Sequence, residues 1–81
     1  MARILVIDDE PAIAISARRM IESLGYRVSS FQNPVLAVEH LRAQAHDYDL
    51  VMSDLTMPGA SGLEIASEIV KLRPDLPIIL T

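Results

Sequence analysis

The stretch RILVIDDE at residues 3–10 decides the fold of this 81-residue chain. Its first five residues, Arg3–Ile7, form a run of strand length that is continuously apolar from Ile4 onward, and an acidic triplet ends it abruptly. An uninterrupted apolar run, in contrast to an alternating one, is typical of a strand that is covered on both faces, as in a parallel sheet. We therefore expect a buried parallel strand here, with carboxylates at its carboxyl end.

A helix is expected directly after this strand. Pro11 is tolerated in the first turn of a helix, and Asp9 is predicted to be its N-cap. Apolar residues then recur with helical spacing, and the side chains expected to face inward are Ile13, Ala17, Met20, Ile21 and Leu24. Gly25 directly after Leu24 predicts where the helix ends.

The alternation of strand and helix continues to the last residue. Further strands are expected at residues 26–31, 49–54 and 76–81, and the first of these is polar enough for an edge position. Two more helices are expected, one from Asn33-Pro34 and one after the turn-rich loop at residues 55–61, with inward side chains Val35, Val38, Leu41, Leu63, Ala66, Ile69 and Val70. This pattern predicts an α/β fold, a doubly wound parallel sheet with right-handed crossovers.

Composition and charge restrict the classes of function. Lys and Arg number 7 and Asp and Glu 11, for a net charge of −4, so we expect no direct nucleic-acid contact from this segment. The absence of Cys excludes disulfide frameworks and thiolate zinc sites and fits the cytoplasm. The apolar runs are short, which predicts neither a membrane span nor a signal peptide. We expect one soluble, cytoplasmic domain over residues 1–81.

Acidic residues follow two of the expected strands. Asp8 and Asp9 come directly after the first strand, and Asp54 ends the third. Open α/β sheets bind ligands at the carboxyl ends of their strands, near the point where strand order reverses, so these carboxylates meet if the two strands are neighbours. Like charges so close repel one another unless a cation neutralises them. Oxygen donors without Cys favour a hard cation, Mg²⁺ or Mn²⁺.

A carboxylate beside such a cation can attack a phosphoryl group and form an aspartyl phosphate. Taken singly, each acidic residue also has a structural interpretation, because Asp after a strand commonly caps a helix or closes a turn. Asp9 is expected to do so in any case, and Asp54 alone is compatible with a loop residue. The combination of an acidic pair after the first strand with an acid at the end of the third is what predicts a site.

Two motifs resemble those of a known family. The segment ILVIDDE at residues 4–10 resembles the first strand and acidic pair of two-component response regulator receiver domains, which are CheY-like. The segment YDLVMSDLTMPG at residues 48–59 is similar to that family's phosphoacceptor strand and loop, and Gly62 stands at its expected glycine. The resemblance covers the whole chain and implies the flavodoxin-like (βα)5 receiver fold.

The resemblance implies a role for each acidic residue and a set of partners. Asp54 is implied to be the phosphoacceptor and a metal ligand, Asp9 a direct Mg²⁺ ligand, and Asp8 a ligand through water or a hydrogen bond. The backbone carbonyl of Thr56 is implied to complete the coordination. A sensor histidine kinase is the implied phosphodonor, and an output domain or downstream protein receives the signal. Self-phosphorylation and self-dephosphorylation are the implied activities, in place of classical enzyme turnover.

The chain departs from the family pattern at its carboxyl end. The family has five βα units, whereas this chain stops in or just after the fourth strand. Thr81 then directly precedes the implied phosphate-contacting Ser or Thr, and the Lys that ends the fifth strand is missing. We expect a fragment of a longer receiver, whose open strand edge at residues 78–80 supports a dimer or strand exchange.

Two other functions fit parts of the sequence. A pseudo-receiver is an assembly module of the same fold that acts through protein contacts without phosphorylation, but it has no need to keep Asp8, Asp9 and Asp54. A phosphohydrolase similar to the haloacid dehalogenases carries Asp-x-Asp after its first strand, whereas this chain has Asp-Asp-Glu. His40 and His46 are interpreted as solvated surface residues, with no role in metal binding or phosphorelay.

Overall fold

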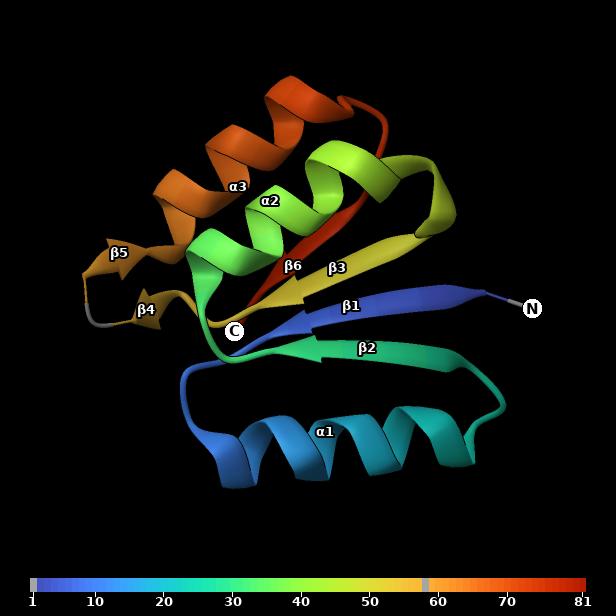
Figure 1. Cartoon of the computed structure of the whole chain (residues 1–81). Helices are drawn as coiled ribbons and strands as arrows, with labels where there is room; N and C mark the ends of the chain where they lie inside the picture. The colour runs from blue at the N-terminus through green and yellow to red at the C-terminus, as the bar shows by residue number, and fades with distance from the viewer. Residues whose placement is uncertain (1, 58) are drawn as a thin grey trace.

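A four-stranded parallel sheet forms the centre of the structure, a computed structural model that describes residues 2–57 and 59–81 (Figure 1). Its strands, β1 (Arg3–Ile7), β2 (Arg27–Phe31), β3 (Leu50–Ser53) and β6 (Ile78–Leu80), lie in the order β2-β1-β3-β6. The chain runs from β1 outward to β2 and then crosses back to β3 on the other side of β1. The predicted doubly wound parallel sheet is therefore confirmed, with the second strand at an edge.

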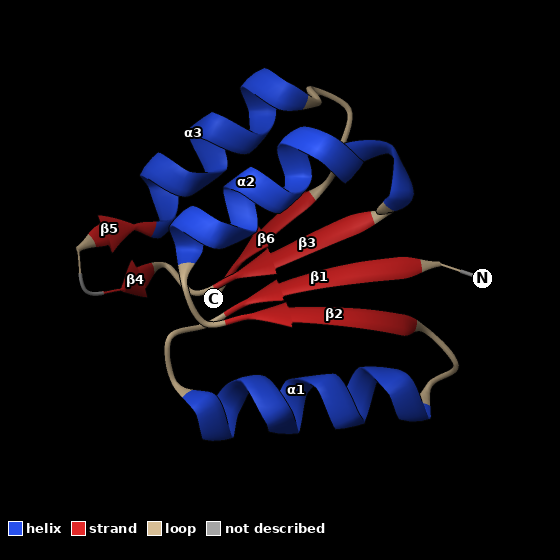
Figure 2. Ribbon diagram, viewed as in Figure 1, coloured by secondary structure: helices blue, strands red, loops and turns tan. Residues whose placement is uncertain are grey.

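Helices cover both faces of this sheet (Figure 2). One face carries α1 (Pro11–Ser23), and the other carries α2 (Pro34–Gln44) and α3 (Gly62–Leu72). Side chains of β1 alternate between the two resulting cores: Leu5 and Ile7 pack with α2 and α3, and Ile4 and Val6 pack with α1. This two-sided burial explains why the first strand is continuously apolar. Among the described residues, no helix has the length and apolar character needed to cross a membrane.

The helices bury narrower faces than their periodicity predicts. The predicted inward residues that are buried are Ile21, Val38, Leu41 and Ile69, joined by Ala14 and Ile65. The predicted inward residues that are exposed are Ile13, Met20, Leu24, Val35, Leu63 and Val70. Periodicity marks an apolar sector at least about 100° wide, whereas a helix lying on a small sheet is covered only along its line of contact. In α1 that line runs along Ala14, Ala17 and Ile21, so Met20, beside it, is 67% exposed.

The segment between β3 and α3, predicted as a loop, contains two short strands. β4 (Thr56–Met57) and β5 (Ala60–Ser61) pair antiparallel, and Thr56 lies opposite Ser61. Gly59 between them has a φ of 77°, a left-handed conformation that favours glycine. Pro58, part of the predicted turn, lies outside the described residues. The hairpin leads directly into α3, where the Ser61 hydroxyl oxygen accepts a hydrogen bond from the Glu64 N–H as the N-cap.

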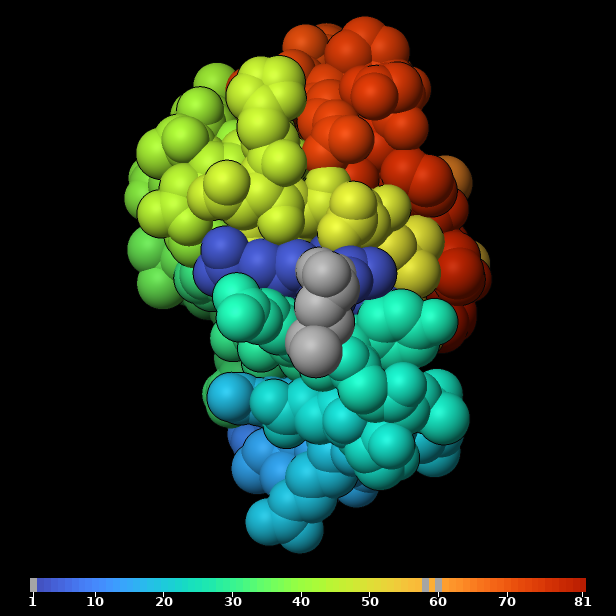
Figure 3. Space-filling view, turned by 90° about the vertical axis from the view of Figure 1, so that its right-hand side faces the viewer, coloured from blue at the N-terminus to red at the C-terminus, as the bar shows by residue number. Residues whose placement is uncertain are grey.

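Tyr48, which precedes β3, connects that strand with α2 and with the residue after α3. It follows the short 3₁₀ helix η1 (Ala45–Asp47), is fully buried, and its hydroxyl oxygen lies 2.6 Å from Nε2 of His40 in α2. The Arg73 guanidinium donates hydrogen bonds to the carbonyls of Ala45 and Tyr48, and Figure 3 shows these two segments, in yellow and orange-red, side by side. His40 is therefore half-buried and hydrogen-bonded, so the prediction of a solvated residue is wrong. Its partner comes from another element and leaves no signal in helical spacing.

Two leucines of α2 test this packing. Leu41 is 0% exposed in the core and Leu36 is 53% exposed on the opposite face. We expect Leu41→Ala to lower the free energy of unfolding by about 2–5 kcal/mol, because it leaves a cavity. Leu36→Ala is expected to change that free energy by only about 0.5 kcal/mol. Urea denaturation followed by circular dichroism measures both changes, and equal losses would contradict the orientation of α2.

Candidate functional site

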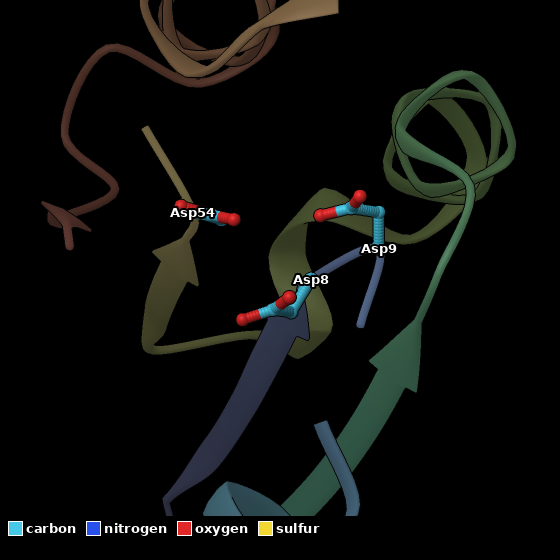
Figure 4. A group of neighbouring side chains, drawn as sticks. All are labelled: Asp8, Asp9 and Asp54. Carbon is cyan, nitrogen blue, oxygen red and sulfur yellow. The ribbon is translucent and has the colours of Figure 1, made fainter. Parts of the chain in front are cut away.

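The structure brings Asp8, Asp9 and Asp54 together at the carboxyl ends of β1 and β3 (Figure 4). Each offers one carboxylate oxygen, and these oxygens all lie within 4.8 Å of one another. The cause is the register of the sheet: Ile7 of β1 pairs with Ser53 of β3, so the residues that follow the two strands emerge at the same level. Parallel pairing of neighbouring strands thus creates a local concentration of negative charge.

Backbone hydrogen bonds continue past the strand ends and fix the acidic residues in place. The Asp8 N–H donates to the Phe31 carbonyl of β2 at 3.0 Å, and the Asp54 N–H donates to the Ile7 carbonyl of β1 at 2.9 Å. Asp8 is buried, while Asp9 and Asp54 are half-buried. The main chain at these positions is therefore hydrogen-bonded to neighbouring strands as it is within the sheet, and the three carboxylates lie close to one another.

The predicted N-cap role of Asp9 is wrong. Helix α1 has Glu10 as its N-cap residue, and no side chain makes a capping hydrogen bond there. The Asp8 carboxylate instead accepts a hydrogen bond from the Glu10 N–H at 2.9 Å, which closes the turn between β1 and α1. The Asp9 carboxylate points toward Asp8 and Asp54. The sequence suggested two roles for Asp9, helix cap and metal ligand, and the structure leaves only the ligand role open.

The loop after β3 also contacts Asp54. The Thr56 N–H donates to Oδ1 of Asp54 at 3.3 Å, and the Leu55 N–H donates to the Thr81 carbonyl at 3.0 Å. A hollow of about 260 Å³ opens beside Asp8 and Asp54, and its wall is mostly apolar, formed by side chains of β1, α1 and β3 that include Val6, Ile13 and Met52. The site therefore combines a hydrogen-bonded Asp54 carboxylate with adjacent open space that is polar only on the side of Asp8, Asp54 and Thr81.

The donor set fits a hard divalent cation. Asp8, Asp9 and Asp54 supply only oxygen, and Mg²⁺ takes carboxylate oxygens together with retained water molecules. In the described part of the chain, no other group of three or more His, Cys, Asp or Glu side chains has the geometry to hold a metal ion. A bound cation offsets the mutual repulsion of the three carboxylates, which gives this cluster a physical reason to bind one.

Ser53 and Gly62 contact Asp54 in ways that the sequence did not indicate. The buried Ser53 hydroxyl donates to the Asp54 carbonyl at 3.2 Å. Gly62 packs against the main chain of Asp54 and Leu55 so closely that a side chain has no room. A polar residue ending an otherwise apolar strand was the available signal for Ser53. Gly62 was recognised only as part of a family pattern, without a physical role.

Comparison with known proteins points to one family. The sequence pattern of the response regulator receiver domain matches residues 4–81. The two-component response regulator ARR14 of Arabidopsis thaliana is 35% identical over 78 residues, which are 96% of this chain and 20% of that protein. A response regulator receiver domain protein from Clostridium thermocellum superimposes with a TM-score of 0.95 at 31% identity, covering 99% of this chain and 64% of that one.

A second solved structure shares more of the sequence. The response regulator TrrA from Thermotoga maritima, solved in complex with Mg²⁺-BeF, has a TM-score of 0.88 and 42% identity over 99% of this chain and 68% of its own. TrrA has also been solved in complex with the histidine kinase ThkA. The chain spans a fifth or less of the length of the curated relatives and about two thirds of the length of these receiver structures.

Charge repulsion at the site predicts the effect of removing one carboxylate. Asp9→Asn removes two repulsive pairs and no capping bond, so without divalent cations we expect it to raise the free energy of unfolding by about 1 kcal/mol at low salt. The gain is expected to shrink as salt screens the charges. Urea denaturation in EDTA at several salt concentrations measures both effects.

Asp47→Asn is the matched control for this prediction. Asp47 lies 3.9 Å from the Arg3 guanidinium, so its charge is attracted and not repelled. We expect Asp47→Asn to leave stability unchanged or slightly lower. A loss of stability in Asp9→Asn, or a gain that salt does not alter, would show that repulsion does not govern the cluster.

Proposed function

The chain belongs to the response regulator receiver domain family, and we propose that it acts as the phosphoacceptor of a two-component signalling system, with Asp54 as the phosphorylated residue. The observation that carries this proposal is the convergence of Asp8, Asp9 and Asp54 within 4.8 Å at the end of β1 and β3. A pseudo-receiver that works through contacts alone has no use for this charge cluster, whose repulsion opposes folding. We therefore rank that alternative second.

In the proposed reaction, a carboxylate oxygen of Asp54 attacks the phosphorus of the donor. A bond forms between that oxygen and phosphorus, and the bond from phosphorus to the donor's leaving group breaks, so the leaving group departs with its electron pair. The sheet hydrogen bond from the Asp54 N–H and the contact from the Thr56 N–H to Oδ1 hold the nucleophile before the reaction begins. Such preorganisation lowers the entropic cost of reaching the transition state.

We assign Mg²⁺ to the same cluster, with Mn²⁺ as a chemically equivalent substitute. The proposed ligands are Asp9, Asp54 and the backbone carbonyl of Thr56, with Asp8 contributing through water or a hydrogen bond. When bound, the cation neutralises the charge between the attacking carboxylate and the phosphoryl oxygens. The all-oxygen donor set supports this assignment, as does the Mg²⁺-BeF complex of the related TrrA.

The proposed phosphodonor is a sensor histidine kinase, supported by the kinase complex of TrrA. An output domain or a separate downstream protein receives the signal in this proposal, since the relatives are several times longer than the matched segment.

In the described part of the chain, β6 pairs on one side only, with β3. We propose that this outer edge supports dimerisation or strand exchange at high concentration. Sedimentation at several concentrations tests this, and a monomer throughout would contradict it.

The central experiment is intact-mass analysis after incubation with Mg²⁺ and acetyl phosphate. We expect the wild-type chain to gain one phosphoryl group, because its nucleophile and cation ligands are both in place. Asp54→Asn, and the wild type in EDTA, are expected to gain none. Circular dichroism of each sample confirms that the chain is folded. A folded wild-type chain that gains no mass would contradict the proposal and favour the assembly-module alternative.

A further inference from the structure

Gly62, the first residue of α3, touches the main chain of the proposed phosphoacceptor. A Cβ atom at this position would lie 2.4 Å from the Asp54 carbonyl oxygen, 2.7 Å from Leu55 Cα and 3.0 Å from the Leu55 carbonyl oxygen. These neighbours are backbone atoms, which cannot swing aside as a flexible side chain can. Gly62 is required here for close approach, since its φ is not in the left-handed region.

The Asp54–Leu55 main chain is held from several elements at once. The Asp54 N–H donates to the Ile7 carbonyl of β1, and the Leu55 N–H donates to the Thr81 carbonyl after β6. The Leu55 carbonyl accepts from the Gly62 N–H at 2.7 Å, and the Asp54 carbonyl accepts from the Ser53 hydroxyl at 3.2 Å. Each polar main-chain atom of these two residues therefore has a partner, and Gly62 supplies the contact that comes from α3.

We propose that Gly62 is a positioning residue for the reaction at Asp54, an inference that rests on the proposed function. Its missing side chain lets the start of α3 press against the Asp54–Leu55 peptide, and this contact sets the direction in which the Asp54 carboxylate leaves the backbone. That direction decides whether the carboxylate meets Asp8 and Asp9 within 4.8 Å. Ser53 acts on the same carbonyl from β3 and is the second positioning residue.

Small displacements at this position have large consequences. Reacting groups must be held within about 0.5 Å of their productive geometry, and a shift of about 1 Å can slow a reaction about 100-fold. A Cβ at 2.4 Å from a carbonyl oxygen forces a displacement of this size. The displacement falls on the peptide that carries the nucleophile and on the start of α3, whose Ile65 belongs to the core with Leu5 and Ile7.

The test compares Gly62→Ala with Ile69→Val. Ile69 is buried in the same helix, two turns farther on, so its shortening lowers stability without reaching Asp54. The first readout is the phosphorylation rate constant at saturating Mg²⁺ and acetyl phosphate, under conditions where urea curves show both chains folded. The second is the amide resonance of Thr56, whose N–H contacts the Asp54 carboxylate and reports its orientation without any phosphorylation.

We expect Gly62→Ala to slow phosphorylation about tenfold or more and to shift the Thr56 amide resonance. Ile69→Val is expected to leave both unchanged. A Gly62→Ala chain with wild-type values, or an equal slowing in Ile69→Val, would overturn the proposal, because the role of Gly62 would then be packing alone. If Gly62→Ala does not fold, Ser53→Ala decides: it removes the hydrogen bond to the same carbonyl, and unchanged values in that variant overturn the proposal.

The two readouts also separate this inference from the proposed function. A wild-type chain that is not phosphorylated refutes the phosphoacceptor function. The Thr56 resonance still decides, in that case, whether Gly62 orients the Asp54 carboxylate. A shifted resonance in Gly62→Ala alone supports positioning, and an unshifted one overturns it.

Discussion

The parallel pairing of β1 with β3 is the interaction on which the rest of this structure depends. The pairing of Ile7 with Ser53 brings two distant acidic segments to the same level of the sheet. It also forces the connection through α1, β2 and α2 to pass over both faces, which buries β1 on two sides. The cores and the carboxylate cluster are therefore consequences of one strand pairing, and a different neighbour for β1 would remove the site together with the fold.

In this arrangement, repulsion among three carboxylates opposes the hydrogen bonds that stabilise the sheet. Asp8, Asp9 and Asp54 repel one another, yet hydrogen bonds from Asp8 and Asp54 to neighbouring strands keep them in place. A small domain has little stability to spare, so concentrated charge of this kind is costly unless it serves a purpose. Under the proposed function, cation binding relieves that cost and couples the stability of the folded chain to occupation of the site. Hydrogen bonds to the Asp54 and Leu55 main chain, together with the close contact of Gly62, hold the backbone beside the same carboxylates.

Prediction from the sequence succeeded where a pattern reflects burial and failed where it depends on which side chain takes part in a hydrogen bond. The continuous apolarity of residues 4–7 reflects burial on both faces and correctly indicated a parallel sheet. Asp9 was assigned to a helix cap because capping is the local use of such a residue, but Asp8 takes the N–H group at that turn. His40 was interpreted as solvated because nothing near it in the sequence shows that Tyr48 reaches it.

The sequence by itself determined the element types, the doubly wound topology and the identity of the acidic residues, because hydrophobic runs and turn residues act over a few neighbouring positions. Only the tertiary structure decided which acidic residues meet, which helix faces are covered, and that Gly62 lies against Asp54. These outcomes depend on strand register and on the depth at which α3 docks. Both are set by packing across the whole chain, which no local pattern records.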